Sequence, residues 1–170
     1  MAPRLFVALL LGLLAGCSRP PELADTVIRA ASAEELAAFR SGLAERFPAD
    51  QLQPFDTALQ ELNLAALSDV PTAEARDVRT RAAVNGRTFR AAVLLGWQAR
   101  RTRLLGETAL VSGLLERALR QKERTAATGT PLSVTHDIEN EQDILTRLRD
   151  DLAETDRRLT GLAAAKPGNP

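Results

Sequence analysis

The spacing of apolar residues near the end of the chain constrains the fold more than any other feature. Four aliphatic residues recur there every seven positions: Ile138, Leu145, Leu152 and Leu159. Seven residues make about two turns of an α-helix, so the four side chains lie on one side of a helix. Leu148 and Leu162 add part of a second apolar line, which Glu141 and Thr155 interrupt. Such a helix needs an antiparallel partner to cover its apolar seam.

The preceding stretch is long enough to be that partner. It contains no proline between Thr88 and Thr125, and five apolar residues keep to one stripe: Val93, Trp97, Leu104, Val111 and Ala118. Three glycines weaken the pattern: Gly96, Gly106 and Gly113. The sequence therefore leaves open one helix, or two helices with a break near Gly106. A loop over residues 126–135, with Gly129 and Pro131, would join the pair.

Three shorter helices are predicted before this pair. The first begins at a Ser-x-x-Glu capping box, Ser32 to Glu35, and stops before Pro48. Its apolar residues follow at steps of three and four: Leu36, Phe39, Leu43 and Phe47. The second repeats this spacing up to Pro71: Leu52, Phe55, Leu59, Leu62 and Ala66. The third covers residues 72–84 and ends at Asn85-Gly86.

No alternation of strand period occurs, so the predicted fold class is all-α. We expect a small domain of about five or six helices with a C-terminal antiparallel helix pair. Charged residues make up 26% and apolar residues 45% of the chain, which is typical of a folded globular protein. One domain is enough for this length.

The chain opens with the layout of a secretory signal peptide. Arg4 supplies one positive charge, and the next ten residues, 5–14, are apolar and uncharged. A helix that crosses a bilayer needs about 20 apolar residues, so this segment is too short to be a permanent membrane span.

The residues that follow, Leu14-Ala15-Gly16-Cys17, resemble the lipobox of bacterial lipoproteins. The resemblance implies a diacylglyceryl group on the Cys17 thiol, cleavage ahead of Cys17 and acylation of its new amine. In Gram-negative bacteria the residue after the lipidated cysteine influences sorting, and Asp there typically retains a lipoprotein in the inner membrane. Ser18 at this position resembles lipoproteins of the outer membrane, so the resemblance implies a place on the periplasmic face of that membrane. The alternative is an ordinary signal peptide followed by an unrelated cysteine. Because Cys17 is the only cysteine, no internal disulfide can form.

These features divide the chain into four predicted parts. Residues 1–16 are the signal peptide, and residues 17–31, with Pro20-Pro21, are the lipid anchor and an extended tether. Residues 32–164 form the helical domain, and residues 165–170 form a flexible tail.

The net charge of zero conceals a basic middle segment between acidic flanks. Two interpretations remain open. Basic helices can pack beside acidic ones inside the fold, or a basic face can contact anionic lipid, lipopolysaccharide or an acidic envelope protein. The candidate binding face consists of Arg117, Arg120 and Arg124, which share one side of the long helix, as Arg100 and Arg103 also do.

The sequence predicts no catalytic residue, metal site or cofactor. His136 is the only histidine, and neither a Gly-x-Ser-x-Gly elbow nor a phosphate-binding glycine loop occurs. The aromatic residues of the predicted helices sit in apolar stripes and are expected in the core: Trp97, Phe39, Phe47, Phe55 and Phe89. A ligand groove beside Trp97 is the alternative to simple packing.

The leading hypothesis is a cell-envelope lipoprotein, held on the membrane by lipid on Cys17, whose helical domain is a non-enzymatic interaction or structural module. A helical module that binds a small apolar ligand or lipid is the alternative. An enzyme ranks third, and it would need His136 in a cleft near a carboxylate. Nucleic acid is not an expected partner of an exported protein.

A second, looser resemblance concerns the turn Val84-Asn85-Gly86-Arg87-Thr88. With the lipobox and the short helices before it, this turn is similar to small uncharacterised proteobacterial lipoproteins that carry Gly-Lys-Thr there. Arg87 replaces the lysine, and the long C-terminal helix pair goes beyond that pattern. This resemblance implies no biochemical activity.

Overall fold

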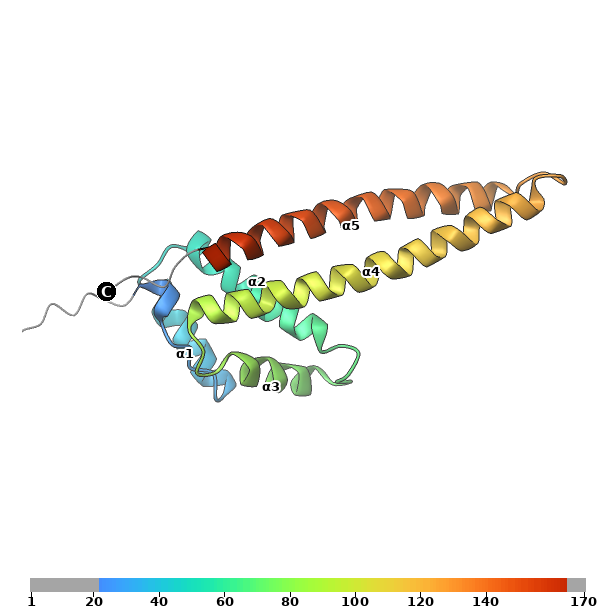
Figure 1. The fold of residues 1–170 in the computed structure, drawn as a ribbon. Coiled ribbons are helices and arrows are strands. Elements are labelled where there is room, and N and C mark those ends of the chain that lie inside the picture. Colours follow the sequence, from blue (N-terminus) through green and yellow to red (C-terminus); the bar gives the residue numbers. More distant parts are fainter. Residues whose placement is uncertain (1–21, 165–170) are drawn as a thin grey trace, which may run out of the picture.

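The computed structural model describes residues 22–164 of the 170-residue chain. One short 3-10 helix and five α-helices follow in order: η1 (Leu23–Asp25), α1 (Ala33–Ala44), α2 (Ala49–Ala65), α3 (Ala73–Val84), α4 (Phe89–Thr125) and α5 (Leu132–Ala164). The all-α prediction is confirmed, and α4 and α5 form the expected antiparallel pair (Figure 1). The predicted signal peptide, Cys17 and the tail 165–170 lie outside the described residues.

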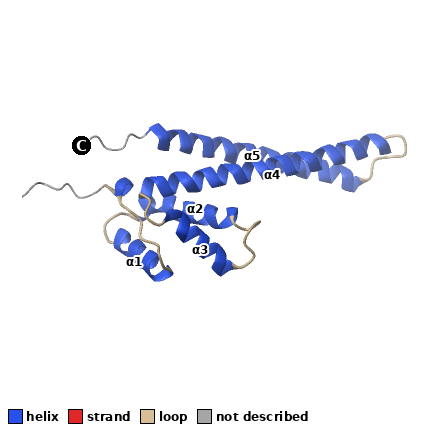
Figure 2. Ribbon diagram, turned by 60° about the horizontal axis from the view of Figure 1, so that its bottom comes forward, coloured by secondary structure: helices blue, strands red, loops and turns tan. Residues whose placement is uncertain are grey.

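The molecule has two parts that differ in how many helices surround α4. In the base, α1, α2 and α3 gather near the start of α4 and the end of α5 (Figures 1 and 2). In the arm, which we define as residues 106–150, α4 and α5 continue as a pair that no other described helix accompanies. Twenty residues of α4 lie in the arm, so it is about 30 Å long.

An apolar cluster fills the base. Phe55 is at its centre, 1% exposed, with the ring of Phe39 edge-on at 6.3 Å and the ring of Phe89 at 5.3 Å. Leu43, Val84 and four further residues complete the buried set, and Leu36, Phe47 and Trp97 pack around it half-buried. Of the five aromatic residues expected in the core, Phe55 and Phe89 are buried, whereas Phe39, Phe47 and Trp97 are half-buried and pack against the cluster.

The segment before α1 belongs to the domain and not to a tether. Ile28 and Ala30 are each 1% exposed, and backbone bonds join Ile28 to Arg87 (2.8 Å) and to Gly86 (3.0 Å). Gly86 has a φ of +74°, the left-handed conformation that allows the turn between α3 and α4 to bond to the segment before α1. We call this segment, residues 22–31, the N-terminal strap. The predicted tether of residues 17–31 is therefore wrong over residues 22–31, because apolar side chains within it complete the core.

The capping box predicted at the start of α1 forms, with one of its two hydrogen bonds displaced by one residue. The Ser32 hydroxyl accepts from the Glu35 backbone N–H (3.1 Å), while the Glu35 carboxylate accepts from the N–H of Ala31 (2.7 Å), one residue earlier than a capping box predicts. Thr72 and Thr88 cap α3 and α4 in the same way as Ser32 caps α1.

The two long helices resolve the open questions about the C-terminal pair. α4 is one continuous helix of 37 residues, so no break occurs at Gly106. α5 begins at Leu132, and the predicted loop to residue 135 is too long, because the carbonyl of Pro131 already accepts from the Val134 backbone N–H (3.1 Å). None of the described helices is both long and apolar enough to cross a bilayer.

The seam between α4 and α5 is apolar for most of its length. Five of its residues are buried: Leu104, Val134, Ile138, Leu145 and Leu148. Leu152 and Leu159 are only half-buried. Thr155, one of the two predicted interruptions, is fully buried, and its hydroxyl donates to the Asp151 carbonyl at 2.7 Å. Glu141, the other interruption, is half-buried, and its Oε2 has no hydrogen-bond partner among the described residues.

Candidate functional site

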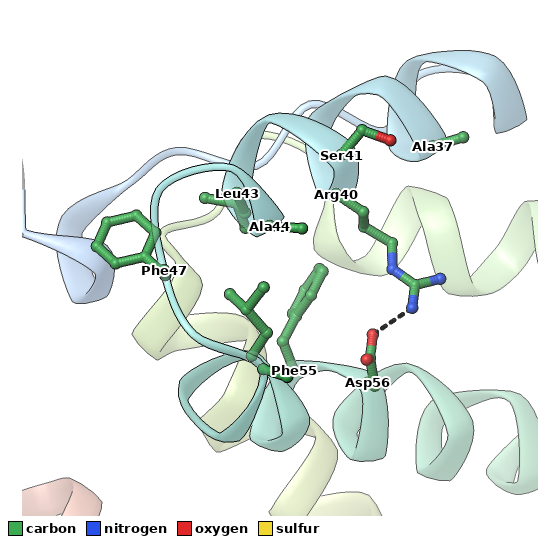
Figure 3. Close-up of a pocket in the computed structure, with 10 residues that line it drawn as sticks. Ala37, Arg40, Ser41, Leu43, Ala44, Phe47, Phe55 and Asp56 are labelled. Carbon is green, nitrogen blue, oxygen red and sulfur yellow. Dashed lines mark hydrogen bonds and ion pairs between the residues drawn. The ribbon is translucent and has the colours of Figure 1, made fainter.

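A groove with a volume of about 500 Å³ lies between α1 and α2. Phe47, Leu52 and Phe55 supply apolar walls, and α1 roofs the space above α2 (Figure 3). At one side Arg40 reaches down from α1 and donates to Asp56 of α2 at 2.6 Å (Figure 3). Both side chains are about half exposed, so this ion pair borders the groove without closing it.

A second groove of about 430 Å³ lies among α1, α2 and α3, and Ala37 and Arg40 line both grooves. The second groove is more polar at one end, where the Asn63 side-chain amide donates to Asp77 at 2.7 Å. Together the two grooves flank α1 over much of its length. They offer apolar walls and a few polar groups, which suits a small apolar or amphipathic molecule.

A third groove, of about 340 Å³, opens at the end of the base where η1 meets the start of α4 and the end of α5. Its walls are mostly apolar and include Leu23, Phe89 and Leu162. Trp97, which the sequence placed beside a possible ligand cavity, lines none of these three grooves. Its ring instead lies under the guanidinium groups of Arg100 (5.6 Å) and Arg158 (5.8 Å).

A buried ion cluster joins three helices in the base. Glu61 of α2 is 5% exposed, and its Oε1 accepts from Arg100 (3.0 Å) and Arg103 (2.9 Å) of α4. Arg103 Nε also donates to Glu61 Oε2 at 3.0 Å, and Arg100 reaches Asp151 of α5 at 3.3 Å. Hydrogen bonding to Glu61 raises the pKa of the Arg103 guanidinium above its usual value.

The ion cluster shows which arginines of the basic middle segment pair inside the fold. Arg100 and Arg103, together with Arg101, which donates to Asp156 at 2.7 Å, neutralise acidic residues of other elements. Internal pairing therefore accounts for these three arginines of the base. Sequence reasoning missed Glu61, since a single glutamate in a helical stretch carries no sign that it is buried against arginines 39 and 42 positions later.

The predicted basic face lies in the arm. Arg117, Arg120 and Arg124 are all exposed. Arg120 contacts Glu116 of its own helix at 3.4 Å, and Arg124 donates to the Arg120 backbone carbonyl at 3.3 Å. Arg117 makes no hydrogen bond or ion pair within residues 22–164. The structure thus brings the three together on one exposed surface, unlike the arginines of the base.

His136 lies near the start of α5 with its side chain 76% exposed. Its Nδ1 is 3.8 Å from Glu139 of the same helix, and it lines none of the three grooves. Within residues 22–164 no three His, Cys, Asp or Glu side chains gather as a metal site would require. His136 therefore does not form the cleft with a nearby carboxylate that the enzyme hypothesis requires.

Known proteins give no direct guide, since no protein-family model, curated protein or solved structure matches this chain. The candidate site must therefore be judged on geometry. Two surfaces stand out: the grooves beside α1, and the exposed face of the arm.

Proposed function

We propose that this protein is a lipoprotein of the bacterial cell envelope, attached to a membrane through lipid on Cys17. Its helical domain acts as a non-enzymatic interaction module that presents the arm to another envelope component. In a Gram-negative host we place it on the periplasmic face of the outer membrane. The lipobox-like Leu14-Ala15-Gly16-Cys17 carries the anchoring part of this proposal.

The proposal that the arm makes contacts is supported by the position of the arm relative to the start of the described chain. Backbone bonds from Thr26 to Phe89 (2.8 Å) and from Ile28 to Arg87 hold the N-terminal strap at the first turn of α4. The 37 residues of α4 then run about 55 Å to the far tip of the arm. The five peptide steps from Cys17 to Glu22 span at most about 18 Å, so a lipid on Cys17 would hold the base near the membrane.

The arm also carries the kind of surface that binds macromolecules. Leu110 is 63% exposed and Leu114 36%, close to the unpaired Arg117. Arginine is enriched in protein contact surfaces, and neighbouring exposed apolar side chains often mark such surfaces. This combination supports a module whose arm makes contacts.

Replacement of Cys17 by Ala tests the anchor. Cells fed labelled palmitate should label the wild-type protein and not the Cys17→Ala variant, and the variant should leave the membrane fraction or remain uncleaved. Equal labelling of the two proteins would refute the lipoprotein proposal. A Ser18→Ala variant is the matched control and should be labelled like the wild type.

The groove between α1 and α2 supports a second candidate function, the binding of a small apolar or amphipathic ligand. Its volume of about 500 Å³ and its walls of Phe47, Leu52 and Phe55 fit such a molecule. Ala37→Trp should obstruct both grooves, because Ala37 lines each of them. Native mass spectrometry of the purified chain should then show a bound small molecule in the wild type and its loss in the variant. A wild-type protein without any such molecule would count against this candidate.

A further inference from the structure

The third groove differs from the two grooves beside α1 in its place and in its chemistry. It lies at the end of the base that is far from the tip of the arm, where η1, the start of α4 and the end of α5 come together (Figure 1). Both grooves beside α1 have Arg40 and an aspartate in their walls. Among the described residues that line the third groove none is acidic, and six are apolar: Leu23, Ala24, Pro54, Phe89, Val93 and Leu162.

The groove exists because α4 extends past the described end of α5. Arg101 contacts Asp156 at 2.7 Å, and in an antiparallel pair each step back along α4 matches a step forward along α5. The last residue of α5, Ala164, lies eight residues after Asp156. It therefore stands level with Val93, which lies eight residues before Arg101. The first turn of α4, which begins at Phe89, is thus left to η1 and the start of α2, and the groove lies among them.

The floor of the groove belongs to the core of the base. Phe89 is 6% and Val93 3% exposed, and both are part of the apolar cluster around Phe55. Leu23 and Leu162 are half-buried and pack against the same cluster. A molecule in the groove would extend this core outward. Because a polar group buried without a hydrogen-bond partner costs free energy, such a place favours an occupant that is apolar along its length.

The start of the described chain brings one apolar molecule within reach. Leu23 and Ala24, which line the groove, come six and seven residues after Cys17. The six peptide steps from Cys17 to Leu23 span at most about 22 Å. An acyl chain spans half of the bilayer core, about 15 Å. Any path of residues 17–23 that is somewhat shorter than full extension therefore brings lipid on Cys17 to the groove.

We propose that this groove binds one acyl chain of the lipid on Cys17. The inference rests on the lipid anchor of the proposed function and adds an acyl-binding site to it. The diacylglyceryl group carries two acyl chains and the acylated amine a third, and two chains already give stable attachment to a membrane. One chain can thus leave the bilayer while the other two hold the protein.

Burial of the groove walls favours the bound state. An acyl chain is out of water in the bilayer and in the groove alike, so its own transfer between them contributes little. The apolar walls, however, face water unless a ligand covers them, and the bound chain removes them from water. The bound chain also holds this end of the base at the membrane. Because the arm leaves the base at the opposite end, its tip then points away from the membrane (Figure 1).

Two peptide segments also begin or end near the groove, and their composition fits it less well. Residues 18–21 include Arg19, and residues 165–170 include Lys166 and Asn169. Charged and amide groups lose water when they are buried, which is unfavourable beside apolar walls. An acyl chain has no such group along its length, so it is the better occupant.

A photoreactive fatty acid tests the proposal in the full chain. Cells are fed palmitate with a diazirine near its methyl end, the membranes are irradiated, and the monomeric protein is digested for mass spectrometry. We expect a covalent link that joins the Cys17 peptide to a peptide containing Phe89 or Leu162, because the bound acyl chain lies between these residues. Links from Cys17 to phospholipid alone would overturn the acyl-binding site and leave the lipid anchor standing. A protein that contains no labelled palmitate would refute the anchor itself.

The form of the link also identifies the source of the acyl chain. A phospholipid attached to the peptides of the groove, without the Cys17 peptide, would show that a free lipid fills the groove and that the proposal is wrong. A groove filled by residues 165–170 would give neither kind of link and would overturn the proposal as well.

Matched tryptophan variants identify the groove. Gln51 is exposed on α2 and lines the groove, so Gln51→Trp fills its mouth without a change to the core. The fraction of protein that carries the link should fall about tenfold. Gln53→Trp is the control, because Gln53 is also exposed on α2 but lies about 200° round the helix and does not line the groove. The control should form the link like the parent, and an equal fraction in both variants would overturn the assignment of the groove.

Discussion

One helix, α4, passes through two different surroundings, and the contrast shows what each requires of the sequence. In the base, Arg103 of α4 bonds to Glu61 of α2 and Arg101 bonds to Asp156 of α5. In the arm Arg117 has no acidic partner within residues 22–164. The base is thus built by contacts inside the chain, while the arm leaves its outer surface open for contacts with other molecules.

The glycines of α4 also differ between the two parts. A Cβ on Gly96, in the base, would lie 2.3 Å from the Cα of Ala58, whereas a Cβ on Gly106 or Gly113 would meet nothing within 4 Å. A glycine of α4 is thus required for close packing in the base, whereas in the arm it lies where space is open.

The largest expected effect tests whether the arm can open without the base. Leu145 is 4% exposed in the seam of the arm, so Leu145→Asp places a charge at a buried position. We expect a loss of about 4 kcal/mol, confined to the arm because only two helices meet there. Hydrogen exchange should accelerate about a thousandfold in residues 106–150 and little in α2 and α3. Equal acceleration everywhere would mean that base and arm unfold as one unit.

Gly96→Ala probes the crossing of α2 and α4. The added methyl group would collide with the backbone of Ala58, which cannot move aside as a flexible side chain can. The free energy of unfolding should fall by about 3 kcal/mol, at the upper end of the usual cost of overpacking. Urea titration followed by circular dichroism measures it, and an unchanged midpoint would show that the two helices do not approach this closely.

The sequence predicted the local features of both parts. Apolar spacing predicted α1, α2 and α5 and the helical stretch of α4, where it left one helix or two open, while Pro71 and Asn85-Gly86 marked the limits of α3. The Ser32 side chain caps α1 at the residue that the capping box predicts. These features depend on residues a few positions apart, which a single sequence displays directly.

Features that depend on distant residues were missed. Gly96 looked only like a weak point in a helix, because the sequence does not show Ala58 passing over it. Glu61 gave no sign of burial, and Ile28 lies in a segment too short to show a period. For the candidate site, the exposed basic face in the arm was predicted, while the groove beside α1 was not, since its walls come from two helices whose crossing is set by packing.

Glu61→Gln tests the buried cluster that separates the base from the arm. The amide keeps the shape of the carboxylate but loses the charge that offsets Arg100 and Arg103. We expect a loss of about 2 kcal/mol, since hydrogen bonds to charged groups are the stronger kind and both arginines are only about a quarter exposed.

Asp56→Asn is the matched control for this change. It breaks the Arg40–Asp56 pair, whose members are half exposed, and exposed pairs contribute roughly 0.5 kcal/mol or less. Thermal melts of the two variants should therefore differ clearly. Equal melting temperatures would show that the buried Glu61 cluster contributes no more to stability than the exposed Arg40–Asp56 pair.

The smallest expected effect has the opposite sign and sharpens the contrast between the two parts. Gly106→Ala and Gly113→Ala add a methyl group where space is open on a helical backbone. Alanine favours helix over glycine by about 1 kcal/mol, so each change should stabilise the arm by up to that amount. Slower hydrogen exchange in residues 106–150 would report it, by about fivefold for each change. Because the same substitution at Gly96 should destabilise the base, the three alanine variants form one series on one helix. If Gly106→Ala also destabilised the protein, the outward face of the arm would have to be covered by something that needs a glycine there, and the open arm described above would be wrong.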